Sequence, residues 1–208
     1  MAEPALIVFE GPENAGKTSV LGLLRNAMPA SCCFLPEAAA EVGQSFPLGT
    51  AGTIGSEVAL MSITAISMWR ASSLVAEGAT VFLDRCWLSN VSYARVRARL
   101  DRSLQMGAGL HEVQAQVLER MFFPIIKRMS VFFFDVSPVN TLSRWESRIE
   151  KPTNHVPSLN WLSESAVELD RVLQEFSIRF PEARIQRIDA DGSVDKVFQS
   201  IESMLASR

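Results

Sequence analysis

The sequence has few residues of several kinds that point to particular classes of protein. Its three cysteines, Cys32, Cys33 and Cys86, are odd in number and two are adjacent, which suits buried, reduced thiols and not a disulfide framework. The two histidines, His111 and His155, are too far apart for a histidine metal site, and His111 is expected at the start of a helix. A formal net charge of -3 gives no general attraction to nucleic acid. Disulfide scaffolds, histidine metal centres and duplex-DNA binders are therefore disfavoured.

The beginning of the chain carries no basic region and no long apolar run. The run over 5–9 is too short for a secretory signal or a membrane span, so we expect a cytoplasmic protein. There is no linker, low-complexity tract or internal repeat, and one domain over 1–208 is therefore expected. Hydrophobic residues make up 48% of the sequence, which is ample for a buried core.

Five short apolar runs alternate with stretches of helical pattern. The expected strands are 5–10, 32–36, 79–84, 130–135 and 184–189. Continuously hydrophobic runs such as Val131–Phe134 are typical of parallel strands that helices cover on both faces. The pattern therefore predicts an α/β, three-layer fold with a five-stranded parallel sheet flanked by helices. The expected helices are 17–28, 52–77, 88–101, 111–129, 138–150, 160–179 and 193–206.

The stretch 57–77 is apolar on most of its faces. Residues such as Leu60, Ile66 and Trp69 leave no clearly polar side, which predicts that the helix is largely buried. An interface between two copies of the chain explains the same pattern, so a homodimer stays an alternative.

Residues 11–18 read Gly-Pro-Glu-Asn-Ala-Gly-Lys-Thr between an apolar run and a helical stretch. Glycines at this spacing let successive backbone N–H groups turn toward an anion, and the helix that follows directs its positive end to the same place. Lys17 adds a mobile charge, and the Thr18 hydroxyl suits a magnesium ion. The segment predicts a three-layer P-loop NTPase whose triphosphate is bound by Gly11, Pro12, Glu13, Asn14, Ala15, Gly16, Lys17 and Thr18.

Acidic residues close four of the expected strands: Glu10, Glu37, Asp84 and Asp135. Ligands of open α/β sheets bind outside the carboxyl ends of the strands, so these residues predict a site for magnesium and proton transfer. Asp84 would orient the metal beside Thr18, although an aspartate at such a junction also caps helices without chemistry.

Arg85 follows Asp84 directly, and a guanidinium there can hold a phosphate through two parallel hydrogen bonds. This junction is part of a motif that runs from Asp84 to Tyr93, and a second motif runs from Phe9 to Thr18. Together they resemble the thymidylate kinases and the related deoxynucleoside kinases.

The resemblance extends to a third segment, Asp135–Pro138 followed by Arg144 and Arg148, at the spacing of that family's first lid arginines. It implies ATP- and Mg²⁺-dependent transfer of a phosphoryl group to a nucleoside or nucleoside monophosphate, with a lid over about residues 144–160. The two arginines lie four apart, and so on one face of the helix expected over 138–150, from which both would reach the phosphates. The alternative is a solvated face.

The acceptor side departs from the family pattern. Leu35-Pro36-Glu37 stands where thymidylate kinases carry Arg-Glu-Pro, so an arginine for an acceptor monophosphate is missing. Glu37 instead resembles the carboxylate that nucleoside kinases place beside the acceptor hydroxyl, where it would accept a proton. A loop glutamate before the helix that begins at Ala38 is the alternative. Arg70 lies closer to Asp84 than the family's substrate arginine, so that role is transferred only weakly.

Other side chains are weaker candidates, and each is at least as well explained by another role. Phe46, Trp69, Trp87 and Tyr93 would stack on an acceptor base or belong to the core, and Lys151 would join the lid.

The leading prediction is therefore a small nucleoside or nucleotide kinase in which Lys17, Glu37, Asp84, Arg85, Arg144 and Arg148 carry the chemistry. One alternative is a P-loop kinase that acts on a modified base or nucleotide in DNA. Another is a regulatory P-loop GTPase or ATPase, although the sequence has no Asn-Lys-x-Asp stretch for guanine. The acceptor, the choice of ATP or GTP, and the choice of Glu37 or Asp84 as base stay open.

Overall fold

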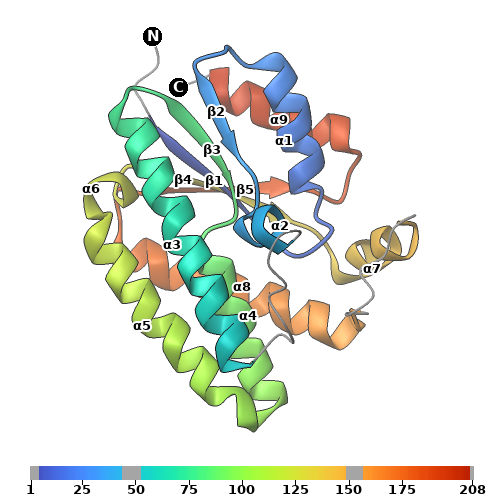
Figure 1. The fold of residues 1–208 in the computed structure, drawn as a ribbon. Helices are drawn as coiled ribbons and strands as arrows, with labels where there is room; N and C mark the ends of the chain where they lie inside the picture. Colours follow the sequence, from blue (N-terminus) through green and yellow to red (C-terminus); the bar gives the residue numbers. More distant parts are fainter. Residues whose placement is uncertain (1–4, 44–52, 149–156, 207–208) are drawn as a thin grey trace.

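The computed structural model of the chain describes residues 5–43, 53–148 and 157–206. Its centre is a parallel sheet in the order β2-β3-β1-β4-β5 (Figure 1). The strands are β1 (Leu6–Glu10), β2 (Cys32–Leu35), β3 (Thr80–Asp84), β4 (Ser130–Asp135) and β5 (Arg184–Asp189). The five predicted strands are confirmed to within one residue at each end, because strands covered on both faces need unbroken apolar runs.

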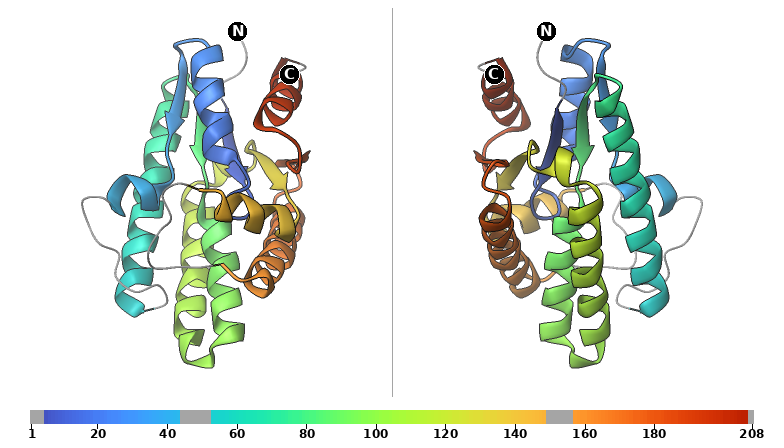
Figure 2. Two further views of the ribbon diagram at one scale, coloured as in Figure 1. Left: turned by 90° about the vertical axis from the view of Figure 1, so that its right-hand side faces the viewer. Right: turned by 90° about the vertical axis from the view of Figure 1, so that its left-hand side faces the viewer.

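Helices cover both faces of the sheet and form the outer two of three layers (Figures 1 and 2). They are α1 (Lys17–Ala27), α2 (Ala38–Gly43), α3 (Ile54–Ala76), α4 (Trp87–Leu100), the 3₁₀ turn η1 (Arg102–Leu104), α5 (Gln105–Met121), α6 (Phe123–Ile126), α7 (Pro138–Glu146), α8 (Leu159–Arg179) and α9 (Val194–Ala206). The predicted three-layer α/β architecture with a five-stranded parallel sheet is thus confirmed.

Alternation of side chains along the strands divides the interior into two cores. Leu6 and Val8 of β1 pack with α3, α4, α5 and α8, whereas Ile7 and Phe9 pack with α1 and α9. Successive strand residues point to opposite faces of a sheet, so each strand supplies both cores. The carboxyl ends of β1, β2 and β3 are therefore held rigidly at one edge.

The fourth predicted helix was placed wrongly. Instead of one helix over 111–129, α5 begins at Gln105, and a turn at Phe122 separates it from α6. Pro124 explains the break because it lacks the N–H that a continuing helix needs. His111 therefore lies inside α5 and is buried, not at a helix start.

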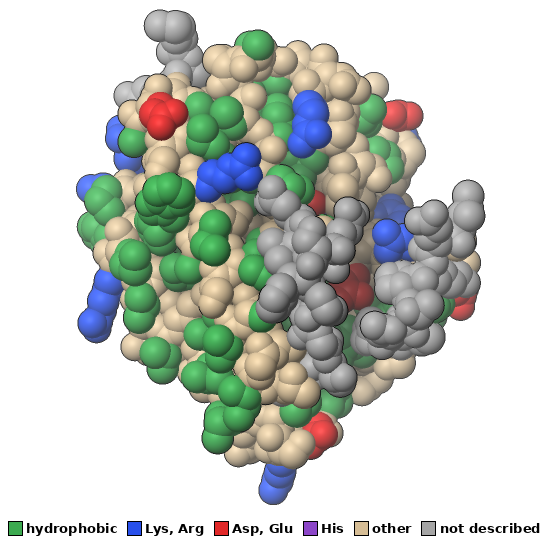
Figure 3. Space-filling view, in the orientation of Figure 1, with side chains coloured by type: hydrophobic (Ala, Val, Ile, Leu, Met, Phe, Trp, Pro, Cys, Tyr) green, Lys and Arg blue, Asp and Glu red, His purple; other side chains and the backbone are tan. Residues whose placement is uncertain are grey.

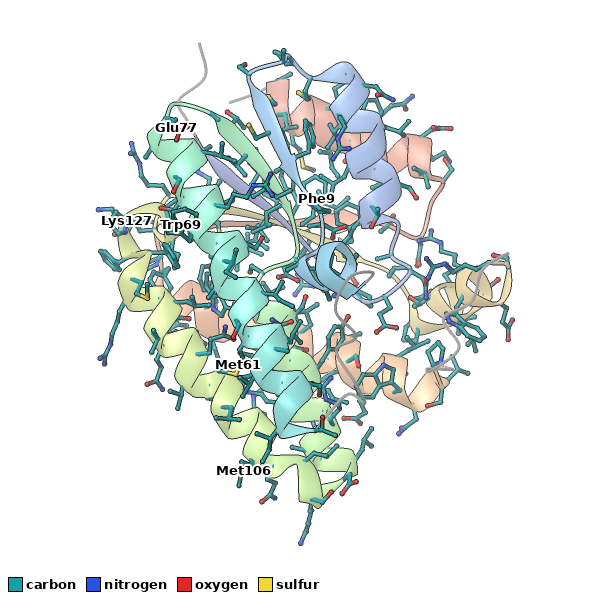
Figure 4. The ribbon with its side chains drawn as sticks, in the orientation of Figure 1. Phe9, Met61, Trp69, Glu77, Met106 and Lys127 are labelled. Carbon is teal, nitrogen blue, oxygen red and sulfur yellow. The ribbon has the colours of Figure 1, made fainter. Side chains whose placement is uncertain are left out.

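The prediction that the stretch 57–77 is largely buried is wrong. In α3, Ile66 and Trp69 are each 63% exposed, and only one face, which includes Met68 and Ala71, packs on the sheet. Apolar side chains continue on the neighbouring α5 (Figures 3 and 4). We call this the α3–α5 apolar surface and define it by Val58, Ile66, Trp69, Val113, Val117 and Met121.

The three cysteines are free thiols, as predicted, but only one is buried. Cys86 lies in the interior, and burial raises the pKa of its thiol well above the usual value. Cys32 and Cys33 in the edge strand β2 are half-buried, because a strand with one neighbour is covered less completely.

A buried ionic cluster joins α3, α4 and α5, three of the helices that cover one face of the sheet. Glu57 is 2% exposed and accepts two hydrogen bonds from Nη2 of Arg97, at 2.8 Å and 2.9 Å. Its Oε2 also contacts Nε2 of His111. The cluster holds these three helices in register below the sheet.

Removal of one partner of this cluster is expected to destabilise the fold strongly. Arg97→Met would remove the guanidinium that donates twice to the buried Glu57 carboxylate, and breaking a buried ion pair costs about 3–5 kcal/mol. Arg171→Met is the control, since the side chain of Arg171 is 67% exposed and pairs with Glu175 one turn along the same helix, α8, at the surface. Urea unfolding of both variants gives the comparison, and equal losses of unfolding free energy would contradict the role of burial.

Candidate active site at the carboxyl edge of the sheet

The loop between β1 and α1 needs glycine at two positions. A Cβ at Gly11 would lie 2.8 Å from the carbonyl oxygen of Phe134, so β4 leaves no room for a side chain. Gly16, which precedes α1, has a φ of 90° that other residues rarely adopt. The loop therefore lies tightly against β4 and leads directly into the N-terminus of α1, the geometry that favours an anion.

Lys17 is folded into its own loop. Its Nζ donates to the carbonyl oxygens of Gly11 at 3.0 Å and Pro12 at 2.7 Å, and the residue is only 5% exposed. Burial, with the nearby charge of Arg85, lowers the pKa of Lys17 to about 7, against the opposing effect of Asp84. The loop holds its cation in place before any anion is bound.

Thr18 and Asp84 meet beside the loop. The Thr18 hydroxyl donates to Oδ2 of Asp84 at 2.8 Å, which joins the first turn of α1 to the end of β3. Burial raises the pKa of Asp84, and Lys17 opposes that rise. Oδ1 of Asp84 is buried and has no hydrogen-bond partner among the described residues. A hydroxyl beside an unpartnered carboxylate oxygen fits a hard cation such as Mg²⁺.

Arg85 has an unusual backbone. Its φ of 67° is left-handed, which costs a residue other than glycine about 1–3 kcal/mol and marks a constrained position. Its side chain is 9% exposed; Nη1 donates to the hydroxyl oxygens of Ser89 at 3.1 Å and Tyr93 at 2.9 Å. Its Nε lies 3.3 Å from Oε1 of Glu37. The strained junction therefore aims one guanidinium at three partners.

Glu37 lies at the mouth of a pocket formed by α2, α3, β3 and α4. Its side chain is 40% exposed, which keeps the carboxylate accessible from solvent. The pocket is lined by Glu37, Ala38, Ala39, Leu60, Thr64, Ser67, Met68, Leu83, Arg85, Cys86 and Asn90. Arg85 is the only cation among them. Apart from the Glu37–Arg85 pair, the side chains that line the pocket are uncharged.

The acidic residues predicted to gather at this edge separate into three environments. Asp84 accepts from Thr18 beside Lys17, and Glu37 pairs with Arg85 at the pocket. Glu10 is fully buried behind them and does not line the pocket. Asp135 does not belong to the group, because β4 ends on the far side of β1 and its side chain pairs with Arg187 of β5.

The lid arginines do not share a helix face, contrary to the prediction. The helix α7 ends at Glu146, so Arg148 lies beyond it. Nη1 of Arg148 donates at 3.0 Å to Oδ1 of Asn14, in the loop between β1 and α1. Nη2 of Arg144 instead donates to the carbonyl oxygens of Ala190 at 2.6 Å and Gly192 at 2.9 Å. Arg148 therefore reaches the loop, and Arg144 joins α7 to the turn after β5.

Among the aromatic candidates, only Tyr93 lies beside the site. It contacts Arg85 through its hydroxyl and stacks on Trp161 of α8 at 6.1 Å, and burial raises its pKa to about 12. Trp87 is part of the core and Trp69 lies on the outer face of α3. Arg70 is exposed on α3 and does not line the pocket. Phe46, Lys151, His155 and lid residues 149–156 lie outside the described residues.

Sequence reasoning missed Ser89 and Trp161. Ser89 contacts both Glu10 and Arg85 from the first turn of α4, four residues after Arg85. Ser89 lies within the motif from Asp84 to Tyr93, and that membership was a usable signal. Trp161 lies 68 residues after Tyr93, and only the packing of α8 on α4 brings the rings together.

Comparisons with known proteins agree on the fold. No protein-family model matches the chain, and no curated protein matches its sequence. A deoxyadenosine kinase from M. mycoides with dCMP and a flexible dCDP bound gives a TM-score of 0.69 at 14% identity, over 97% of this chain and 99% of that chain. A thymidylate kinase from Candida albicans gives 0.66 at 16% identity, over 100% and 93%.

A second structure of the M. mycoides enzyme, with dATP bound, gives a TM-score of 0.70 at 13% identity, over 96% of this chain and 98% of that chain. At these identities the likeness shows the fold alone, and it extends over nearly the whole of each chain. The chain therefore has the three-layer P-loop kinase fold of the thymidylate and deoxynucleoside kinases.

Proposed function

We propose that the chain is one kinase domain that transfers the terminal phosphoryl group of ATP to a nucleoside or nucleoside monophosphate. The observation that carries this proposal is the meeting of two sets of residues at one sheet edge. Lys17, Thr18 and Asp84 surround the phosphate loop, and Glu37 and Arg85 border the neighbouring pocket. A donor and an acceptor held side by side are what phosphoryl transfer needs, because its catalysis is largely positioning.

On the donor side, the loop amides and the N-terminus of α1 would bind the triphosphate. Lys17 would exchange its two loop carbonyls for phosphate oxygens, and burial makes its charge count for more there. Thr18 and Asp84 would hold Mg²⁺. When bound, the ion neutralises charge on the phosphate oxygens.

On the acceptor side, Glu37 would accept the proton of the attacking hydroxyl while Arg85 holds its carboxylate in place. The pocket favours an uncharged nucleoside over a monophosphate. Arg85 is already bound to Glu37, Ser89 and Tyr93, and it is the only cation among the described pocket residues. A phosphate dianion beside Glu37 would be repelled unless that pairing broke.

We propose that a lid over about residues 144–160 closes on the phosphates, with Arg148 as its first contact. Its bond to Asn14 already joins the end of α7 to the phosphate loop. Closure would exclude water, so that the phosphoryl group passes to the acceptor and not to solvent.

The test is a screen of the purified protein with Mg-ATP and Mg-GTP against nucleosides and nucleoside monophosphates, with nucleoside diphosphate production as the readout. We expect production that depends on an added nucleoside. Triphosphate loss without dependence on any acceptor would indicate a hydrolytic switch. Activity only on oligonucleotides would indicate an acceptor within a polymer, and both outcomes would overturn the proposal.

We also propose that two copies associate through the α3–α5 apolar surface. Its six defining side chains are each 47–64% exposed. They present on the order of 600 Å² of apolar area, most of the roughly 800 Å² that each partner buries in a standard interface. By length and composition α3 resembles a membrane span, but Met68 and Ala71 anchor it to the sheet. A second copy, related by two-fold symmetry, fits this surface best.

Trp69→Glu is expected to convert the dimer into a monomer, because it places a charge in the centre of this apolar area. Sedimentation velocity at micromolar concentration measures the change. Val167→Glu is the matched control, since Val167 is 69% exposed on α8, away from this surface, and its variant should stay dimeric. A monomeric wild type at about 100 µM, or binding to lipid vesicles instead, would contradict the proposal.

A further inference from the structure

The carboxylate of Glu10 is buried directly behind the acceptor pocket. It closes β1, is fully buried and accepts hydrogen bonds at both oxygens. Oε1 accepts from the backbone N–H of Cys86 at 2.9 Å and from its thiol at 3.1 Å, and Oε2 accepts from the hydroxyl of Ser89. All three donors belong to the start of α4, the turn that follows Arg85.

The hydroxyl of Ser89 links this carboxylate to Arg85. Burial raises the pKa of Glu10, and the charge of Arg85 with the hydrogen bonds from Ser89 and Cys86 opposes that rise. When Glu10 is ionised its carboxylate can only accept, so the single hydrogen of Ser89 is directed to it. The serine oxygen is then free to accept from Nη1 of Arg85, at 3.1 Å. The same guanidinium forms an ion pair with Glu37, whose Oε1 lies 3.3 Å from its Nε. One chain of contacts therefore runs from Glu10 through Ser89 and Arg85 to Glu37.

We propose that Glu10 positions the Arg85–Glu37 pair for the transfer reaction proposed above, on which this role rests, and that it acts through the hydroxyl of Ser89. Glu10 does not itself line the pocket, and the Ser89 hydroxyl joins its carboxylate to Arg85, whose charge also attracts it. Its contact with the Cys86 N–H also fixes the turn after the left-handed Arg85.

The role requires two acceptor atoms, which distinguishes a carboxylate from its isosteric amide. In Glu10→Gln, one oxygen becomes an NH₂ donor that must face either the Cys86 N–H or Ser89. If the NH₂ group faced Cys86, two hydrogen-bond donors would lie against each other. If it faced Ser89, the serine hydroxyl would accept from the amide and turn its hydrogen toward Arg85, which would displace the guanidinium.

The first readout is a double-mutant cycle on the kinetics of transfer. Glu10→Gln and Ser89→Ala are each expected to lower kcat by about tenfold to 10²-fold, the loss that displacement of a catalytic group by about 1 Å brings. Affinity for an ATP analogue should change less than twofold. The kcat of the double variant should match that of Ser89→Ala within about twofold. Loss of the Ser89 hydroxyl already breaks the chain of contacts from Glu10 to Arg85, which we call the relay. Multiplicative losses, or an unchanged kcat in Glu10→Gln, would overturn the proposal.

The second readout is independent of activity. Tyr93 is the only tyrosine in the sequence, and its hydroxyl accepts from the same Nη1 of Arg85. Selective ¹³C-tyrosine labelling therefore gives one reporter of the position of Arg85. The ring signals should shift in Glu10→Gln and in Ser89→Ala alike, and unchanged signals in both would refute the relay. If Glu10→Gln does not fold, Ser89→Ala decides by the same signals and rates.

Glu119→Gln is the matched control for loss of a buried carboxylate. Glu119 is 8% exposed, binds Arg179 between α5 and α8, and neither lines the pocket nor bonds to Ser89 or Arg85 in the hydrogen bonds of the described residues. Its variant should lose stability but keep kcat and the Tyr93 signals; an equal loss of kcat would show that Glu10 is only structural. If the wild type phosphorylates no acceptor, the proposed function fails, whereas the Tyr93 signals still test the relay.

Discussion

Lys17→Ala is expected to reduce phosphoryl transfer by about 10³-fold or more, the scale on which a cation stabilises charge on the transferring group. In the structure its Nζ binds the carbonyls of Gly11 and Pro12, the position from which it would turn to the phosphates. The loss should appear both in kcat and in the affinity for ATP, because the charge meets the donor before and during transfer. Initial rates and calorimetric titration with an ATP analogue measure the two effects.

The same variant should stay folded. Burial and the charge of Arg85 disfavour protonated Lys17 in the folded chain, as its pKa of about 7 shows, so alanine removes a charge that the fold holds at a cost. The midpoint of thermal unfolding should therefore stay the same or rise at neutral pH. Lys127→Ala, remote from the site on the turn after α6, is the control and should keep full activity. Transfer within tenfold of wild type in Lys17→Ala would remove the basis for the kinase proposal.

Glu37→Gln is expected to lower kcat by about 10²–10⁴-fold, the usual contribution of a general base, while affinity for the ATP analogue stays near that of wild type. The amide keeps the shape of the side chain but does not take the proton of the acceptor hydroxyl. Because Glu37 is 40% exposed, the fold should be little affected. Steady-state kinetics with the acceptor found in the screen measures the effect.

Asp84→Asn distinguishes the two carboxylates. Asp84 lies against Thr18 on the donor side, so its variant should raise the Mg²⁺ concentration needed for half-maximal rate, whereas Glu37→Gln should not. Glu37→Asp is the conservative control and should recover part of the lost rate, since the carboxylate remains but is one methylene shorter. A Glu37→Gln enzyme that keeps more than half of wild-type kcat would assign the base to Asp84 instead.

The sheet could be predicted from the sequence because its physics is local. Each parallel strand buried on both faces must read as an apolar run, and the run Val131–Phe134 is β4 almost in full. The phosphate loop could be predicted for a similar reason. Gly11 and Gly16 occupy positions where the backbone itself excludes other residues. In both places one short segment contains the whole cause of its structure.

Predictions that needed the partner of a side chain were less successful. Apolar content on all faces of α3 implied burial, but composition does not say how much protein lies beside a helix, and Ile66 and Trp69 stay exposed. The helix with Arg144 ends early, and that guanidinium binds carbonyls of the turn after β5, some 46 residues away. Such contacts depend on tertiary packing and leave no trace in the local pattern.

The predicted helix boundaries around His111 were wrong for a third reason. Gly107 and Gly109 weaken helical propensity near the start of α5, yet Gly107 is buried there. Packing of α5 on α4 outweighs the propensity of two glycines. Local preference sets the expectation, and the neighbouring helices decide the result.

The strand order β2-β3-β1-β4-β5 has a consequence for how such a protein can diversify. The residues around the pocket come from the chain between Glu37 and Tyr93, on the β2–β3 side of the phosphate loop. Arg144, Ala190 and Gly192 come from the later part of the chain, on the β4–β5 side. Substitutions around the pocket on the β2–β3 side can therefore leave the contacts of Arg144 on the β4–β5 side unchanged. Under the proposed function, the pocket for the acceptor could change in the course of evolution while the loop over 11–18 stays the same, provided that Asp84 at the end of β3 is kept.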